Sequence, residues 1–580
     1  VPTIDDTGIN VSPEGLVETG TVTNPAAVFV EGVNTVAVQM FNQGVNSSDL
    51  IFDLKIAPPG ADQLEPTPTP GGPNLVLAPN AAPNIRKVNH TPQQPTDVDQ
   101  VVITALVTDP EGVASVELEY QLVRPGRYLP ARLSYDAPNI PVQNELQENP
   151  DYDLPANWTT VTMVDDGTGG DALAGDDIYS VTLPPQGHRV LVRYRITVED
   201  ALGLSERVPY ADDPSLNFAY FVYNGVPSYN GHSVETMNSL PVYHLLTHKD
   251  DWDECIAYNS GDQISQGSPN PARFYYNWSG TLVYDGEVYD NIRYRLRGAN
   301  GRYYARGKRS MRFRLNKGRY FQARDQFGNE YPRKWRTLTT GKCFGNRQNL
   351  SYSLNEAVTM YLYNKVGVPA ANTHWVQWRV IDEAREAPDQ WHGDFHGIYF
   401  ILETYDVRFL ESHDLEKGNI YKLINSTRSA DRQRRYQSAY GATGGIDHDW
   451  IENTLGGNTN PDTVRAHVNL EKWNLNHAMV EAIRHYDYWP SANKNMVYYF
   501  EPDYLPANRG YGKLWILPWD TDATWGPTYN SGHDAVYNAL FAASGGGADG
   551  GTNPELWPDY FNTVRELRDL LWQPDQLDGV

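Results

Sequence analysis

A proline-rich stretch near the start of the chain argues against a single packed domain. Residues 58–83 are rich in Pro, Thr, Gly and Ala and include Pro-Thr-Pro-Thr-Pro-Gly-Gly-Pro at 66–73. Proline donates no backbone hydrogen bond and repeated proline favours an extended chain, so this stretch predicts a stiff linker. A chain of 580 residues has room for several domains, and the linker separates the first from the rest.

Strand-like alternation of apolar and polar residues appears on both sides of the linker. Residues 1–57 end in two such stretches, which predict the last strands of a jelly-roll-like β-sandwich truncated at its N-terminus. Three further stretches lie within residues 84–224, at 101–107, 115–120 and 189–198. Turn residues separate them, and this spacing predicts an immunoglobulin-like β-sandwich. The remaining residues, 225–580, are expected to form another domain.

An acidic loop interrupts the second predicted sandwich. Its sequence, Asp-Asp-Gly-Thr-Gly-Gly-Asp-Ala-Leu-Ala-Gly-Asp-Asp, places carboxylates at Asp165, Asp166, Asp171, Asp176 and Asp177. Oxygen ligands separated by glycines are typical of a calcium loop. A solvated acidic turn accounts for the same pattern, so both interpretations remain open.

The charge of the chain is unevenly distributed. Residues 293–348 contain 17 Lys and Arg but only two acidic residues, Asp325 and Glu330, a local charge of +15 in a chain of formal net charge −25. Self-repulsion within such a block is commonly offset by a bound polyanion. A solvated basic hairpin that faces the acidic remainder of the protein is the alternative.

Two predicted strands within this block have one cationic face each. In 291–297 the apolar residues alternate with Arg293, Arg295 and Arg297, and in 308–315 they alternate with Ser310, Arg312 and Arg314. Lys308 shares the parity of the basic residues in the second strand. The connecting residues 298–307 include three glycines, and the whole is suited to a hairpin that lays arginines and backbone amides over phosphates.

A second motif, at 513–526, points to a divalent cation. Leu514 to Leu517 predict a buried strand that Pro518 ends, and Asp520 and Asp522 follow it. Residues 520 and 522 share strand parity, so both carboxylates are expected on one side, where they suit magnesium. Asp and Gly also gather at strand exits because they favour turns, which is the competing explanation.

Several of these motifs resemble the spore-coat protein CotH kinase family. The resemblance runs from about residue 240 to at least 526 and rests on Arg-Leu-Arg-Gly-Ala-Asn (295–300), Lys308, Gly-Ile-Tyr-Phe-Ile-Leu-Glu (397–403), Lys494-Asn495 and Pro-Trp-Asp-Thr-Asp (518–522). Where His-Asn is common in the family, this chain has Lys494-Asn495. The resemblance implies an α+β atypical protein-kinase-like domain that binds ATP with Mg or Mn and phosphorylates secreted proteins.

Within that resemblance, each candidate residue has an expected role. Lys308 would contact the nucleotide phosphates, and Asp487 would be the catalytic base that accepts the proton of the acceptor hydroxyl. The other residues expected at the nucleotide are Arg295, Arg297, Glu356 and Glu403. The residues expected at the metal are Asn495, Asp520 and Asp522.

Some of these residues have alternative roles. A helix is predicted over 353–366 with Leu354, Ala357, Val358, Tyr361 and Leu362 on its buried face. Glu356, in the first turn of this helix, is expected either to pair with Lys308 or to be a plain N-terminal helix charge. Glu403 is a rival partner for Lys308 or a contact to the adenine. Asp487 is alternatively a cap for the loop amides that follow it.

The remaining features suit an exported protein. Cys255 and Cys343 are the only cysteines, and the sequence leaves open whether they pair. No apolar run is long enough to span a membrane. No signal peptide begins at Val1, so one is expected to have been removed before it. We therefore expect a secreted or cell-surface multidomain protein, with β-sandwich modules followed by the kinase-like domain.

Three function classes follow from these expectations. The first is a metal-dependent kinase that uses ATP to phosphorylate an extracellular or envelope protein. The second is a catalytically silent CotH-fold surface protein that acts as an adhesin or a structural binding module. The third is a carbohydrate-associated module, which would leave the basic block unexplained. No nucleic-acid partner is expected.

Overall fold

A computed structural model of the chain describes the following residues: 80–134, 147–257, 276–297, 304–305, 308–325, 327–341, 343, 353–387, 393–423, 432–436, 446–455, 460–485, 488, 495–502, 512–525 and 554–579. The chain divides into two compact units, Val1–Ala81 and Ala82–Val580. The predicted jelly-roll strands and nearly all of the predicted linker lie outside the described residues.

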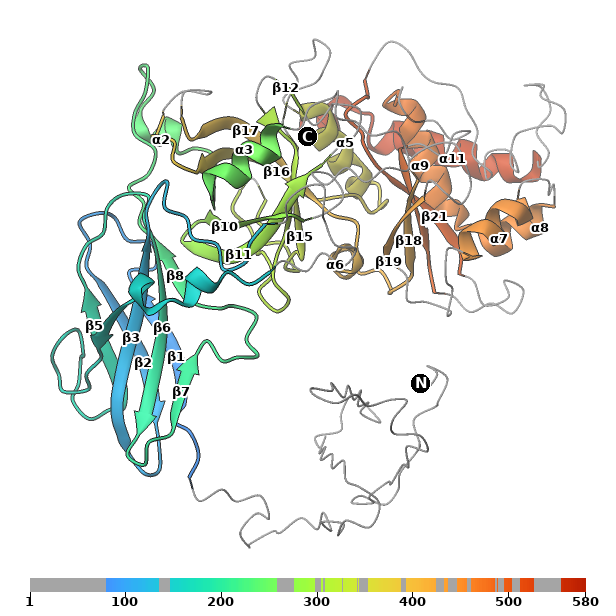
Figure 1. The fold of residues 1–580 in the computed structure, drawn as a ribbon. Coiled ribbons are helices and arrows are strands. Elements are labelled where there is room, and N and C mark those ends of the chain that lie inside the picture. The colour runs from blue at the N-terminus through green and yellow to red at the C-terminus, as the bar shows by residue number, and fades with distance from the viewer. Residues whose placement is uncertain are drawn as a thin grey trace, which may run out of the picture. The chain divides into compact units, whose positions relative to one another are not determined.

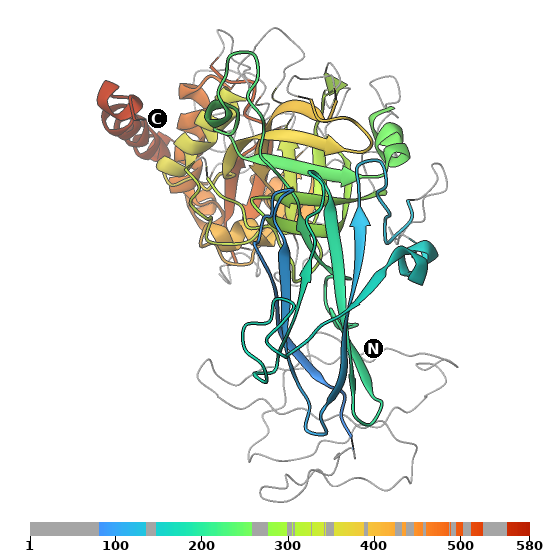
Figure 2. The same ribbon diagram turned by 90° about the vertical axis from the view of Figure 1, so that its left-hand side faces the viewer.

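Two facing β-sheets open the second unit (Figures 1 and 2). One sheet has the order β1-β2-β5, and the other has the order β4-β3-β6-β7 with β8 also paired to β6. Their bounds are β1 Asn84–Thr91, β2 Val101–Thr108, β3 Val113–Val123, β4 Thr159–Thr162, β5 Ile178–Leu183, β6 Leu191–Asp200, β7 Ser205–Val208 and β8 Phe218–Phe221. Two 3₁₀ turns, Pro150–Asp153 and Pro155–Asn157, precede β4. The three predicted strands correspond to β2, β3 and β6, and every second residue of β2 is fully buried, as the alternation predicts.

A closed barrel follows, with the strand order β10-β11-β14-β15-β17-β16-β9. Its strands and the short elements beside them are α2 Val234–Met237, β9 Val242–Thr247, α3 Lys249–Ala257, β10 Trp278–Tyr284, β11 Glu287–Leu296, β12 Tyr304–Ala305, β13 Lys308–Arg309, β14 Met311–Arg314, β15 Thr337–Gly341, β16 Thr373–Ile381 and β17 Phe395–Glu403. Neighbouring strands are antiparallel except β9 and β16, which are parallel. Closure leaves the barrel no free edge strand.

The alternation predicted for the basic block is present in β11 and β14. Ile292, Tyr294 and Leu296 are buried in the barrel core, whereas Arg293 and Arg295 are half-buried on the outside. The strands pair antiparallel, with Arg293 opposite Arg314 and Arg295 opposite Arg312. Lys308 is an exception, because β13 and β14 are separate strands and Lys308 is buried instead of lying on the cationic face.

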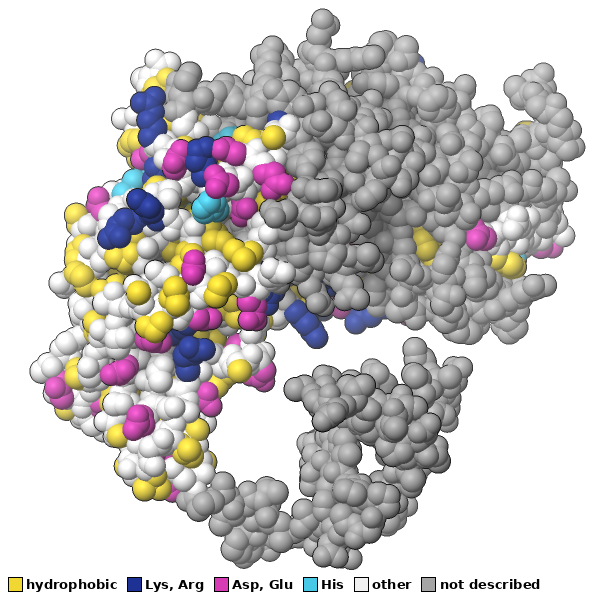
Figure 3. Space-filling model, viewed as in Figure 1, with side chains coloured by type: hydrophobic (Ala, Val, Ile, Leu, Met, Phe, Trp, Pro, Cys, Tyr) yellow, Lys and Arg dark blue, Asp and Glu magenta, His cyan; other side chains and the backbone are white. Residues whose placement is uncertain are grey.

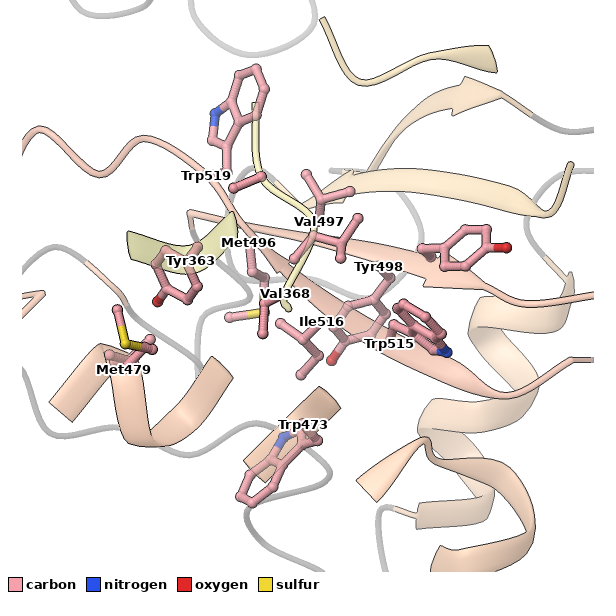
Figure 4. Close-up of a cluster of buried hydrophobic side chains, with 14 of the residues drawn as sticks. Tyr363, Val368, Trp473, Met479, Met496, Val497, Tyr498, Trp515, Ile516 and Trp519 are labelled. Atoms are coloured by element: carbon pink, nitrogen blue, oxygen red, sulfur yellow. The ribbon is translucent and has the colours of Figure 1, made fainter. Parts of the chain in front are cut away.

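A four-stranded sheet with the order β19-β18-β20-β21 forms the C-terminal part. Its strands and the helices after the barrel are α5 Leu354–Lys365, α6 Val407–Ser412, β18 Asn419–Leu423, β19 Arg432–Tyr436, α7 Ile446–Leu455, α8 Pro461–His467, α9 Leu470–Ala482, β20 Met496–Phe500, β21 Leu514–Pro518, the 3₁₀ turn Pro554–Leu556, α11 Trp557–Leu570 and α12 Pro574–Leu577. Side chains of α5, α9 and this sheet share one apolar core. Figure 4 shows part of it, with Trp473 and Met479 of α9 near Met496 and Ile516.

The helix predicted over 353–366 is confirmed as α5, but its buried face was assigned only partly correctly: Ala357 and Leu362 are buried and Val358 packs against the core. Leu354 and Tyr361 are 52% and 42% exposed, whereas Glu356, Met360 and Tyr363 are buried. With about 100° of rotation per residue, residues 356, 360 and 363 lie on nearly the opposite side of the helix from Leu354 and Tyr361. Tertiary contacts therefore favour the face that carries Glu356, and this glutamate is not a surface charge.

A buried ion pair links the sandwich to the barrel. Arg193 of β6 is fully buried, and its guanidinium binds both carboxylate oxygens of Asp290 in β11, at 2.7 and 3.0 Å. Burial raises the pKa of the Asp290 carboxyl, but Arg193 and neighbouring donors outweigh it and hold the pKa below its usual value. Apolar side chains from both parts pack beside this pair, among them Leu191 and Phe221 of the sandwich and Val288 of the barrel.

We predict that Arg193→Met destabilises the protein by about 3–5 kcal/mol, because it leaves the Asp290 carboxylate buried without its partner. Urea denaturation measures the change. The matched control is Arg207→Met on exposed β7, which should change the free energy of unfolding by less than about 0.5 kcal/mol. Equal stability of the two variants would show that the Arg193–Asp290 pair does not join the sandwich to the barrel energetically.

Candidate functional site

The segment that follows β21, residues 518–525, is fixed by hydrogen bonds to several other elements. These bonds are Tyr405 Oη to Pro518 O at 2.7 Å, His485 Nε2 with Asp520 O at 3.2 Å, Asn355 Nδ2 to Thr524 O at 3.2 Å, and Trp525 N to Ile483 O at 2.6 Å. The segment is therefore held between α5, the end of α9 and the residues after β17. Such support is what a binding site on an irregular segment needs.

Asp520 and Asp522 lie in different environments. The strand ends at Pro518 and Asp520 has a φ of 56°, so strand alternation does not extend to these residues. Asp520 is half-buried and Asp522 is exposed. The inference from shared parity is thus wrong, because a left-handed turn, and not a strand, presents the two carboxylates. Their convergence on one cation stays a prediction.

Asn495 lies next to this turn. In the pairing of β20 with β21, Met496 is opposite Pro518, so Asn495 comes beside Trp519, the neighbour of Asp520. The Asn495 side chain is buried, and its φ is 61°. Two left-handed residues that are not glycine therefore meet at the same end of the sheet. Backbone strain of this kind is concentrated at functional sites.

Glu356 of α5 contributes a second carboxyl group to the same place. Burial, opposed by Arg297 and reinforced by Asp520, raises the pKa of Glu356 to about 7. Glu356 therefore interacts electrostatically with the guanidinium of Arg297 and with the carboxylate of Asp520. The structure brings together one cation from the barrel, one acid from α5 and one acid from the turn after β21.

Two further residues at this site were missed by the sequence reasoning. The ring of Trp519 has Lys422 Nζ at 4.3 Å and the Arg297 guanidinium carbon at 5.9 Å from its centre. Both are within the range of a cation–π interaction. Lys422 belongs to β18. The sequence feature that could have pointed to it is a single lysine in the otherwise uncharged run Asn-Ile-Tyr-Lys-Leu.

Lys308 is close to the site but does not pair with Glu356. Its ammonium donates a hydrogen bond to Ile398 O at 2.5 Å and lies 5.1 Å from the ring centre of Tyr399. Burial lowers the pKa of Lys308 to about 8, and the nearby Cys343 opposes this shift. Among the described residues, Lys308 forms no ion pair with a carboxylate, so neither of its two proposed acidic partners is bound to it.

The other predicted site residues either have partners of their own or lie outside the described residues. Oε2 of Glu403 accepts hydrogen bonds from Asn372 and from His413, at 3.0 and 3.1 Å, instead of binding Lys308. The guanidinium of Arg295 lies 5.0 Å from the ring centre of Tyr276. Asp487 lies outside the described residues, and its role as the base stays a prediction.

Both cysteines are buried and free. Cys255 lies in the core of the barrel, whereas Cys343 lies in the core shared by α5, α9 and the C-terminal sheet. The two are therefore separate thiols, and the open question of their pairing is settled against a disulfide.

The acidic loop of the sandwich is compact. Asp165, Asp171 and Asp176 each offer a carboxylate oxygen, and these atoms lie within 4.8 Å of one another. Asp165 also accepts backbone hydrogen bonds from Gly175 and Asp177, at 2.7 and 3.0 Å. Asp166 and Asp177 are not part of the three-residue group. The donor set of three carboxylates fits a hard cation such as calcium.

Comparison with known proteins identifies the C-terminal part of the chain. Residues 297–564 match the family model described as CotH kinase protein, which confirms the resemblance inferred from the motifs. No curated protein matches the sequence. In the described part of the chain, no helix is both long enough and apolar enough to cross a membrane.

Two solved structures that match this chain are only weakly similar to it. The sporulation control protein Spo0M from Bacillus subtilis is 8% identical over 40% of this chain and 80% of its own, with a TM-score of 0.14. A mutant of Kfla1895, in complex with cyclobis-(1->6)-alpha-nigerosyl, is 11% identical over 55% of this chain and 30% of its own, with a TM-score of 0.12. Neither supports an argument about fold or function.

We predict that Glu356→Gln changes how stability depends on pH. The folded pKa of about 7 lies above the ordinary value of 4.5, so the wild type loses stability as pH rises between these values. The variant lacks this loss and should be more stable at pH 8, on the order of 1–3 kcal/mol, with the difference vanishing near pH 4.5. Thermal denaturation from pH 4.5 to 8 measures it.

The matched control for this experiment is Glu566→Gln, which removes an exposed carboxyl from α11. Its stability profile should follow that of the wild type. If Glu356→Gln also followed the wild type at every pH, the Glu356 carboxyl would not be held protonated by its surroundings.

Proposed function

We propose that this chain, which carries a CotH kinase family domain over residues 297–564, is a metal-dependent protein kinase that transfers phosphate from ATP to an extracellular or envelope protein. We propose a secreted or cell-surface location, in keeping with the spore-coat association of the family. The kinase-like α+β character of the domain belongs to the same proposal.

The proposal rests on the grouping of Arg297, Glu356 and Asp520. Phosphoryl transfer requires a cation at the phosphates, oxygen ligands for a divalent metal and a group that orients the acceptor hydroxyl. Arg297 supplies the first, and the carboxylate of Asp520 with the neighbouring Asn495 supplies oxygens that suit magnesium or manganese. Asp522, exposed on the same turn, would add a further oxygen ligand.

Each of the main candidate residues has a definite task under the proposal. Arg297 and Lys422, which both lie against Trp519, would bind negative charge on the nucleotide. Glu356 would keep Arg297 oriented, and it would ionise more readily once a metal cation lies beside it. Asp487 would accept the proton of the acceptor hydroxyl. ATP, when bound with its metal, supplies the phosphoryl group.

Lys308, Arg295 and Glu403 have less direct tasks. Lys308 would reach a phosphate only after releasing Ile398 O, and its pKa of about 8 leaves it mostly charged at neutral pH. Glu403 has a buried Oε1 without a hydrogen-bond partner, which suits acceptance from an adenine amino group. Arg295, on the outer side of β11, would contribute positive charge near the nucleotide.

One observation favours the silent surface protein as the second candidate. The Lys308 ammonium is engaged by a backbone carbonyl and an aromatic ring instead of a carboxylate. A binding module would need neither a metal nor Asp487. A direct assay of catalysis separates the two candidates.

We predict that the full chain transfers labelled phosphate from ATP to a casein-like acceptor in the presence of Mg or Mn. Asp520→Asn should reduce the rate by about 100-fold or more by removing a metal ligand. Asp487→Asn should reduce it similarly while ATP-induced thermal stabilisation is retained, because only the base is lost. Asp575→Asn, at an exposed position in α12, is the control and should keep full activity.

Absence of transfer by the wild type with several acceptors, together with no thermal stabilisation by ATP and metal, would leave the silent surface protein as the function. Unchanged turnover of Asp487→Asn at saturating ATP would remove only that residue from the mechanism.

We also propose that the acidic loop binds calcium in a structural role. Its three carboxylates converge in the loop between β4 and β5, where a cation would offset their mutual repulsion. Calcium bound only by the folded state would stabilise it by mass action.

We predict that millimolar calcium raises the Tm of the wild type by several degrees and that Asp171→Asn abolishes this shift. Differential scanning calorimetry with calcium or with a chelator measures it. Asp212→Asn, an exposed aspartate elsewhere on the sandwich, should retain the full shift. The same response in both variants would assign calcium to another site.

A further inference from the structure

A partly exposed tryptophan ends the segment that carries Asp520. Trp525 follows Asp520 by five residues, and its side chain is 42% exposed. It is not part of the apolar core shared by α5, α9 and the C-terminal sheet. Exposure alone does not single out Trp525, because hydrophobic side chains lie among charged ones across the described surface in Figure 3. What distinguishes Trp525 is the way in which the protein holds it.

The backbone of Trp525 has an unfavourable conformation. Its φ is 63°, in the left-handed region that a bulky residue rarely adopts. Glycine adopts this conformation without strain. Residues strained in this way persist only where their surroundings hold them, and they are concentrated at functional sites. A tryptophan at this position therefore requires a reason that lies in its side chain.

Two hydrogen bonds fix Trp525, one through its backbone and one through its indole ring. The backbone nitrogen donates to Ile483 O at 2.6 Å, and the indole nitrogen donates to Thr359 Oγ1 at 3.2 Å. Among the described residues, no aromatic ring or cation is stacked on the Trp525 ring, whereas Trp519 of the same segment has two cations against it. The ring is thus held in place with part of its surface open to solvent.

The backbone bond connects Trp525 to the segment that leads to the proposed base. Ile483 is the C-cap of α9, and Asp487 follows it by four residues. The cations proposed to bind the nucleotide lie against Trp519 instead. Under the proposed function, the acceptor hydroxyl must reach the base through a hydrogen bond. The acceptor chain is therefore expected to pass near Trp525.

We propose that Trp525 is a specificity-determining residue, whose exposed ring binds a large apolar side chain of the acceptor polypeptide within three residues of the hydroxyl that receives phosphate. The inference rests on the proposed kinase function. An indole ring offers a large apolar contact at a small cost in conformational freedom. An apolar side chain that packs on the ring is withdrawn from water, which favours binding. The substrate class is therefore a polypeptide with a hydroxyl residue close to a large aliphatic or aromatic residue.

The short chain distance between the proposed metal ligands and Trp525 limits where the apolar side chain can lie. Trp525 follows Asp522 by three residues, and three residues of chain span at most roughly 10 Å even when fully extended. An acceptor hydroxyl at the proposed metal site is thus about this distance from the ring. Three residues of an extended acceptor chain cover the same distance.

The test is a series of 13-residue peptides with a central serine or threonine, in which one phenylalanine replaces alanine at each position from −3 to +3 in turn. Transfer of labelled phosphate from ATP and Mg by the full chain gives kcat/KM for each peptide. Phenylalanine at one of these positions should raise kcat/KM about tenfold over the all-alanine peptide, mainly by lowering KM, because the contact serves binding. Phenylalanine at −6 should have no effect.

Trp525→Ala should make the kcat/KM values of the best phenylalanine peptide and the alanine peptide equal to within about twofold. Trp525→Phe keeps an apolar ring without the indole N–H and should retain a preference of about threefold or more, which separates the ring contact from the integrity of the turn. The matched control is Phe327→Ala, which removes an 80% exposed ring between β14 and β15 and should keep the full preference. A preference that survives in Trp525→Ala, or that is absent from the wild type at every position, would overturn the proposal.

Photo-cross-linking without nucleotide distinguishes failure of this inference from failure of the kinase proposal. The same peptides carry benzoylphenylalanine in place of phenylalanine, and mass spectrometry maps the adducts. We expect adducts within residues 518–525 or α5, and their yield should fall about fivefold or more in Trp525→Ala but not in Phe327→Ala. Adducts elsewhere would overturn the inference even for a protein without transferase activity. Phosphate transfer without a preference for the apolar residue would overturn the inference and leave the kinase proposal standing.

Discussion

The proximity of two carboxyl groups, Glu356 and Asp520, is the interaction on which the candidate site depends. Two ionised acids in a partly buried place repel each other, so a neighbouring cation is required for both to be charged. Arg297 supplies one positive charge, yet the pKa of Glu356 still lies near 7. Burial is the main cause of this raised pKa, and the charge of Asp520 adds to it, so Glu356 would ionise more readily beside a further cation. Under the proposed function, a divalent cation would supply this charge and take part in phosphoryl transfer.

The rest of the fold holds these charges in place. The closed barrel fixes the end of β11 and with it Arg297, while the apolar core between α5, α9 and the C-terminal sheet fixes Glu356 and Asp520. Hydrogen bonds then lock the turn after β21 against α5 and the end of α9. The sandwich contributes indirectly. Its Arg193 binds Asp290 in β11, the strand that Arg297 directly follows. The positions of Arg297, Glu356 and Asp520 are thus determined by elements that are distant in sequence.

The sequence predicted the local elements well because period-2 and helical patterns report burial directly. The strands predicted at 101–107, 291–297 and 514–517 and the helix predicted at 353–366 all occur, with β11 beginning a few residues earlier than expected. The face of α5 was predicted only in part because the position of Glu356 was treated as polar, whereas its side chain is buried together with Ala357 and Leu362. Local pattern cannot reveal a buried charge whose partner comes from another element.

The candidate site was only partly predictable for the same reason. Asp520 and Arg297 were found from motifs, but their connection through Glu356 depends on how α5 packs, and Lys422 was missed because its strand was not recognised as a neighbour. Strand parity does not apply to Asp520 and Asp522, because β21 ends at Pro518 and Asp520 has a left-handed backbone. Closure of the barrel and separation of β13 from β14 likewise depend on long-range pairing.

Anomalous diffraction from a crystal of the full chain with Mn²⁺ and a non-hydrolysable ATP analogue tests the central claim most directly. We expect an anomalous peak bound by Asp520, with Asn495 beside it and the nucleotide phosphates directed toward Arg297. A nucleotide bound elsewhere, or Mn²⁺ absent from Asp520 at saturating concentration, would contradict the claim.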